Sequence, residues 1–241
     1  MSVPSKMIER PRRSIIVTSH CPSLTDPLLI SGLPGVGFAG SIAVAHLIKV
    51  LKAQRFGEVY SPYFQDATYS GGHGDMRRPT IELYSGVSPN GRDLVLLYGN
   101  AQPMTNYGQY EVSGKLLDQA QKIGCSLIIS LAGLRREYAG ERPQVFYAAS
   151  GLTTADPLVV RGINPLQGEV YGMAGLLVGL ARLRGIHAIC LLAETLGLFP
   201  DPNAAKALLE RLSSLYGVET DMSDLPGTAK EVSETLQSLS L

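Results

Sequence analysis

Short apolar runs alternate along this chain with segments that have a helical pattern of apolar residues. Such runs are typical of strands buried on both faces of a sheet, because helices then cover each side. The alternation predicts an α/β fold, a three-layer αβα sandwich around a mostly parallel, mixed sheet, with an antiparallel hairpin around residues 70–79. The predicted strands cover residues 27–31, 59–69, 80–84, 93–98, 126–132, 144–149 and 186–193.

Several helix ends are marked by residues that satisfy free backbone groups. Thr105 can cap a helix that ends at Gly124, because glycine readily adopts the left-handed conformation of a C-cap. Asp201 followed by Pro202 predicts another start, since the carboxylate accepts hydrogen bonds from free amides and proline suits the first helical position. The predicted helices cover residues 41–51, 105–123, 168–183, 202–215 and 229–239.

The last predicted helix is amphipathic. Thr228 and Glu231 have the spacing of a capping box, and Val232, Leu236 and Leu239 fall on one face. That face can pack on the chain's own domain or on a neighbouring subunit, so its three apolar residues are interface candidates. We therefore expect a tail at residues 1–13, one α/β domain at 14–225 and the amphipathic helix at 226–241.

The composition limits the classes of partner. The 21 basic and 21 acidic residues cancel, so no broad electrostatic field favours nucleic acid or an anionic membrane. No apolar run reaches the ~20 residues that span a bilayer, and no apolar signal core follows the charged N-terminal segment. The three cysteines lie far apart without a CxxC pair, which is typical of a reducing compartment, and we expect a cytoplasmic protein.

A GxGxxG motif follows the first predicted strand and opens a helix, with its glycines at Gly35, Gly37 and Gly40. Such glycines permit close approach of the backbone to a phosphate at a helix N-terminus, so a dinucleotide or phosphate site is one interpretation. A Rossmann acid should end the second strand, but Glu58 would begin the next strand, and Pro34 departs from the usual turn. The favoured interpretation is a tight strand-to-helix connection packed on the sheet.

A second glycine series comprises Gly168, Gly172, Gly175 and Gly179, which would line one face of the predicted helix 168–183. Glycine inside a helix costs about 1 kcal/mol relative to alanine, so the series needs a compensating close contact. The contact could be with the sheet or with a second subunit. Gly172 and Gly175 are therefore interface candidates.

Polar residues follow the ends of the predicted parallel strands, which meet at one edge of the sheet where ligands tend to bind. Asn100, Gln102, Glu169 and Glu194 could frame a pocket there together with the loop at Gly35. The alternative is that these amides and carboxylates only cap helices and satisfy loop backbones.

Catalytic patterns are missing from the sequence. The histidines at positions 20, 46, 73 and 187 have no HxxH or HExxH spacing, and no P-loop lysine follows the glycine motif. His73 and Asp75 could form a general-base pair, but a solvated hairpin turn is the favoured interpretation. We predict no catalytic or metal-binding residue and no cofactor, and a non-catalytic role is favoured.

Six short segments occur in the same order as in a known family. Together they resemble the proteasome assembly chaperone family, in particular its second-subunit type with archaeal and bacterial homologues. The resemblance extends over residues 14–225. The segments are residues 29–40, 96–103, 130–133, 168–175, 192–195 and 200–202.

The resemblance implies an αβα sandwich related to nucleoside phosphorylase-like folds, a homo-oligomer, and in some relatives binding to proteasome α-subunits. It supplies no catalytic residues. Relatives can dock through a tail with a penultimate tyrosine, whereas Ser240 stands at that position here, so docking of that kind is not expected. The expected function is a non-catalytic, oligomeric assembly chaperone or scaffold. The alternative is a protein or enzyme that binds a nucleoside, nucleotide or phosphate at the Gly35 loop.

Overall fold

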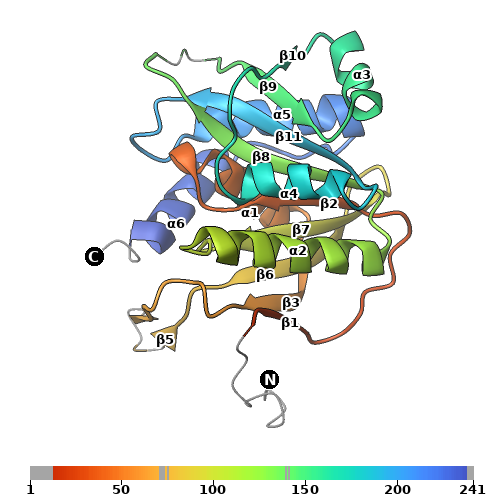
Figure 1. The fold of residues 1–241 in the computed structure, drawn as a ribbon. Helices are drawn as coiled ribbons and strands as arrows, with labels where there is room; N and C mark the ends of the chain where they lie inside the picture. Colours follow the sequence, from red (N-terminus) through yellow and green to blue (C-terminus); the bar gives the residue numbers. More distant parts are fainter. Residues whose placement is uncertain (1–12, 71–73, 75, 139, 141, 238–241) are drawn as a thin grey trace.

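The computed structural model describes residues 13–70, 74, 76–138, 140 and 142–237, and these form one mixed sheet with helices on both faces (Figure 1). A separate two-stranded hairpin, β4 (Tyr69–Ser70) and β5 (Met76–Arg77), lies outside this sheet. Across the main sheet the strands are β1 (Ile15–Thr18), β3 (Gln54–Tyr60), β6 (Ile81–Val87), β7 (Asp93–Gly99), β2 (Leu28–Gly32), β8 (Leu127–Arg135), β11 (His187–Thr195), β9 (Val145–Ala149) and β10 (Asn164–Pro165).

The centre of the sheet is parallel and its flanks are largely antiparallel. Strands β7, β2, β8 and β11 run parallel, and the residues in the middle of each are buried. Strands β1, β3 and β6 pair antiparallel on one side, while β9 pairs antiparallel with β11 on the other. The predicted mixed α/β sandwich is therefore confirmed.

The early hairpin differs in detail from its prediction. The antiparallel pair is β3 with β6, but β3 begins at Gln54 and ends at Tyr60 instead of covering 59–69. Its first residues, Gln54 and Arg55, are polar and exposed, so the apolar pattern did not indicate a strand there. The edge strand β1 was also missed, because its residues are only half buried.

Two layers of helices cover the sheet. Helices α2 (Asn106–Ile123) and α4 (Met173–Arg182) lie in front of it in Figure 1, while α1 (Ala39–Val50), α5 (Pro202–Tyr216) and α6 (Leu225–Gln237) cover the opposite face. Helix α3 (Leu152–Val160), which the sequence did not predict, contains Pro157 and lies against β9 and β10. No helix among the described residues is both long and apolar enough to cross a membrane.

Two predicted helix caps are confirmed. The Thr105 hydroxyl accepts a hydrogen bond from the Gly108 amide at 3.1 Å, and Gly124 ends α2 with a φ of 86°. Asp201 accepts the amide hydrogen bond of Ala204 at 3.0 Å and so begins α5.

The capping box predicted for the last helix is wrong. Helix α6 begins at Leu225, so Thr228 lies inside it, and the Thr228 hydroxyl donates to the Asp224 carbonyl at 3.2 Å. Val232 is buried against the core of its own chain, between α6 and the layer of α1 and α5. It is therefore not exposed to a neighbouring subunit. The side chain of Leu236 and all of Leu239 lie outside the described residues, as do His73 and Asp75.

Candidate functional site

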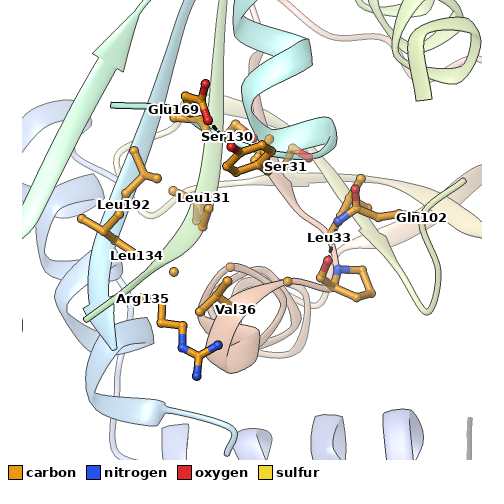
Figure 2. Close-up of a pocket in the computed structure, with 18 residues that line it drawn as sticks. Ser31, Leu33, Val36, Gln102, Ser130, Leu131, Leu134, Arg135, Glu169 and Leu192 are labelled. Atoms are coloured by element: carbon orange, nitrogen blue, oxygen red, sulfur yellow. Dashed lines mark hydrogen bonds between the residues drawn. The ribbon is translucent and has the colours of Figure 1, made fainter. Parts of the chain in front are cut away.

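A partly enclosed cavity of about 270 Å³ lies at the carboxyl ends of β2 and β8, on the face of the sheet that α2 and α4 cover (Figure 2). Its walls come from the sheet, from the loop after β2 and from the segment before α4. In Figure 2, Leu134 and Leu192 line one flank and Gln102 the opposite one. The apolar lining includes Leu33, Val36, Leu134, Val170, Ala174 and Leu192.

Two serine hydroxyls lie deep in this cavity. Ser31 on β2 and Ser130 on β8 are direct neighbours across the two strands and are 2% and 1% exposed. In the part of the chain that the structure describes, neither hydroxyl has a hydrogen-bond partner, and neither is among the polar atoms sealed from all accessible space. Since an unpaired hydroxyl inside a protein is costly, water or a ligand that enters the cavity would be a favourable partner for the pair.

The GxGxxG glycines are explained by packing. A Cβ on Gly40 would lie 2.1 Å from the backbone oxygen of Leu131, and one on Gly37 would lie 2.7 Å from the Thr195 hydroxyl. Gly37 also has a φ of 61°, which favours glycine. The loop is thus held against the α1 face of the sheet, and of the three motif glycines Gly35 and Gly40 border the cavity while Gly37 does not.

Two predicted site residues, Gln102 and Glu169, join Gly35 at the cavity. The Gln102 amide bridges two walls: its nitrogen donates to the Pro34 carbonyl, and its oxygen accepts from the Met173 amide at 3.1 Å. Glu169 is exposed at the rim and accepts a hydrogen bond from the Tyr171 hydroxyl. That hydrogen bond raises the pKa of the Tyr171 phenol.

Asn100 and Glu194 do not line the cavity. The Asn100 amide oxygen accepts from the Thr80 amide at 2.8 Å and its nitrogen donates to the Arg78 carbonyl. The Glu194 carboxylate pairs with the Arg136 guanidinium at 3.2 Å. Both side chains satisfy neighbouring loops, which is the alternative that the sequence left open.

The second glycine series does not lie on one helix face, because α4 begins only at Met173. Gly168 and Gly172 precede the helix with φ values of 131° and 76°. A Cβ on Gly175 would lie 2.3 Å from the Val170 backbone oxygen, and one on Gly172 would lie 3.2 Å from the Gln102 amide oxygen. These close contacts are within the chain, so the glycines shape the cavity wall, and a subunit contact at Gly172 and Gly175 stays a prediction.

The cysteine on the strand next to Ser130 is chemically unreactive. Cys190 on β11 is the strand neighbour of Ser130, and complete burial raises the pKa of its thiol to about 12. The described residues contain no cluster of histidine, cysteine or carboxylate groups able to hold a metal ion. Arg135, at the rim, forms no ion pair within the described chain.

Sequence reasoning missed Ser31 and Ser130, since each was counted within an apolar strand. The available signal was a single serine interrupting each of two adjacent buried strands. It also missed a group of large apolar side chains exposed on the loops at the carboxyl edge of the sheet, which we call the apolar rim. The apolar rim comprises Val36, Met104, Tyr107, Tyr138, Tyr171, Leu196, Leu198 and Phe199.

Comparison with known proteins agrees with this fold. PbaB of Pyrococcus furiosus, an archaeal proteasome activator, is 34% identical and superposes with a TM-score of 0.83, covering 96% of this chain and 100% of PbaB. PbaA of the same organism, an archaeal homolog of proteasome-assembly chaperone, is 25% identical with a TM-score of 0.77, covering 94% of this chain and 96% of PbaA.

Sequence relatives give the same result. An uncharacterised protein of Methanocaldococcus jannaschii is 30% identical over 218 residues, which is 90% of this chain and 84% of the relative. The model of the PAC2 family matches residues 29–240. These matches confirm the resemblance drawn from the six short segments, and the chain belongs to the PAC2 family.

Proposed function

We propose that this chain is a non-catalytic assembly chaperone or scaffold that self-associates and recognises proteasome-type α-subunits. Its family and its likeness to PbaB and PbaA support a role of this kind. The observation that carries the proposal is the apolar rim, because it supplies a contact surface on the folded domain itself.

The apolar rim has the composition of a protein interface. Large exposed apolar patches on a folded protein commonly mark sites of protein association, and aromatic residues and methionine are enriched in them. Tyr138, Tyr171 and Phe199 are 84%, 82% and 77% exposed. Apart from Tyr171, these residues follow strands of the parallel centre, so the topology brings them to one edge of the molecule, and Tyr171 joins them at the cavity.

The polar groups at the same edge support a binding role over a catalytic one. Asp201 caps α5 and also accepts a hydrogen bond from Thr195 at 2.6 Å, while Glu194 is paired with Arg136. These carboxylates are engaged in holding loops in place. General acid–base chemistry needs a group free to meet a substrate, which neither carboxylate offers here.

The test is co-elution of the purified chain with proteasome α-subunits from its own host in size-exclusion chromatography. We expect a complex that is lost in a variant carrying Leu198→Ser and Phe199→Ser. The matched control carries Leu152→Ser and Leu183→Ser, which change two residues that are at least as exposed but lie at the opposite edge. Complex formation that persists in the rim variant, or is lost only in the control, would show that the rim is not the contact surface.

Self-association is measured on the same samples by light scattering. A monomer at all concentrations would contradict the oligomeric part of the proposal without affecting the subunit-binding part.

A further inference from the structure

We infer that the cavity beside β2 and β8 is a binding site for a small, mainly apolar molecule that carries one uncharged hydrogen-bonding group, such as a hydroxyl, carbonyl or amide. This inference is independent of the proposed function. It rests on the shape of the cavity, on its apolar lining and on the two unpartnered serine hydroxyls within it.

The inner end of the cavity defines the polar group. Ser31 and Ser130 lie further back along their strands than Leu134 and Arg135, so their hydroxyls are at the end remote from the carboxyl edge. A hydroxyl both donates and accepts, so the pair can meet a ligand hydroxyl, carbonyl or amide. No charged side chain of the described chain hydrogen-bonds to either hydroxyl. The Glu169 carboxylate, drawn beside Ser130 in Figure 2, is exposed and already accepts from the Tyr171 hydroxyl. Burying an unpaired charge is far more costly than burying a neutral group. A charged head at this end is therefore disfavoured.

The remaining lining defines the body of the ligand. Leucine, valine and alanine side chains form most of the wall, which favours an apolar body. A volume of about 270 Å³ accommodates on the order of a dozen non-hydrogen atoms at the packing density of proteins. The two charged residues of the lining, Glu169 and Arg135, stand at opposite ends of the site in Figure 2 and are exposed, so they border the cavity without defining its interior.

The segment before α4 offers a route into the cavity. Residues 167–171 are held at their flanks, where the Leu166 amide donates to the Tyr147 carbonyl at 2.7 Å and the Met173 amide donates to Gln102. Between these two anchors, no amide of the described segment donates to another backbone group. Gly168 and Gly172 flank it with positive φ values, so rotation at glycine can displace it without disturbing the sheet.

The test uses four fluorinated probes of similar shape, and fluorine NMR measures the binding of each probe to the protein. They are 4-fluorobenzyl alcohol with a neutral head, 4-fluorotoluene without a polar head, 4-fluorobenzoate with an anionic head and 4-fluorobenzylamine with a cationic head. We expect the alcohol to bind with a dissociation constant of about 1 mM, the range open to so small a ligand, and at least about tenfold more tightly than either charged probe.

Two variants distinguish hydrogen bonding to the serines from nonspecific apolar binding. The double variant Ser31→Ala with Ser130→Ala should weaken binding of the alcohol by about tenfold and leave binding of the toluene within about twofold, because only hydrogen bonds are removed. Ser113→Ala is the matched control, since Ser113 is another buried and unpartnered serine of the α2 and α4 face but lies outside the cavity. It should leave the binding of all probes unchanged.

A filling variant, Ala174→Leu, should abolish saturable binding of both the alcohol and the toluene. Where that variant does not fold, the serine variants decide the question alone. Equal affinity of alcohol and toluene for the wild type would mean that water alone satisfies the two hydroxyls, and this would overturn the inference. Failure of every probe to saturate at about 10 mM would overturn it as well.

Discussion

The two faces of the central strands differ sharply at their carboxyl ends. On the face that α1 covers, Gly32, Gly40 and Gly133 let backbones approach so closely that an added Cβ would lie 2.1 Å from a carbonyl oxygen in each case. On the face that α2 and α4 cover, Ser31 and Ser130 border an open cavity. Ser31 and Gly32, which are consecutive on β2, thus face opposite sides of the sheet: Ser31 borders the cavity, and Gly32 is packed tightly against α1.

The difference shows what a glycine motif indicates in this fold. Glycines were expected to leave room for a ligand phosphate, but the space beside them is taken by the chain itself. The usable space lies on the opposite face, beside small polar residues. Three experiments test this difference between the two faces.

The largest effect concerns thiol reactivity. Cys190 neighbours Ser130 on the cavity face, and burial raises its pKa to about 12, whereas Cys21 is exposed. At pH 8 a thiol with that pKa is only about 0.01% thiolate, and the thiolate is the reactive form. We expect iodoacetamide to modify Cys21 at least about a thousandfold faster than Cys190 in the native protein, as measured by peptide mass spectrometry.

A urea-unfolded sample, in which the two thiols should react alike, serves as the control for that measurement. Rapid alkylation of Cys190 in the native state would mean that the cavity face opens far enough to admit the reagent. The accessible part of the α2 and α4 face would then extend from the cavity to β11.

The next largest effect concerns an added methyl group. Gly40→Ala places a Cβ against the backbone of Leu131, which is fixed in the sheet, so the free energy of unfolding should fall by about 3 kcal/mol or more. Ser130→Thr adds one methyl group on the cavity face and should change the stability by less than about 1 kcal/mol. Urea unfolding of both variants measures the difference, and equal losses would show that the cavity face is packed as tightly as the other.

Much of the fold could be predicted from the sequence, because the parallel strands are buried on both faces and their apolar runs are continuous. The caps at Thr105 and Asp201 were also found, since each depends on a local hydrogen bond. Elements whose stability comes from distant contacts were not found. The edge strand β1 pairs with β3, and α3 contains a proline, so neither has a clear local pattern.

The candidate site was predicted only in part, and for a related reason. Position in the topology brought Gly35, Gln102 and Glu169 to one cavity, as the strand order indicates. Whether a polar side chain faces a cavity or a neighbouring loop depends on its local partners. Asn100 is hydrogen-bonded to Thr80, and Glu194 is ion-paired with Arg136. The serines were missed because each lies in a run of buried residues, so the sequence pattern does not tell which side chains face the cavity.

The smallest effect comes from deleting a hydroxyl on each face. Ser41 on α1 has a sealed hydroxyl with no hydrogen-bond partner among the described residues, so Ser41→Ala should raise the free energy of unfolding by about 1 kcal/mol. The hydroxyl of Ser130 reaches the cavity and can bind water there, so Ser130→Ala should change stability by less than about 0.5 kcal/mol. Urea unfolding at one pH compares the pair directly. A gain of equal size in both variants would mean that the Ser130 hydroxyl is unsatisfied in the cavity as well, and the two faces would then differ in volume but not in polarity.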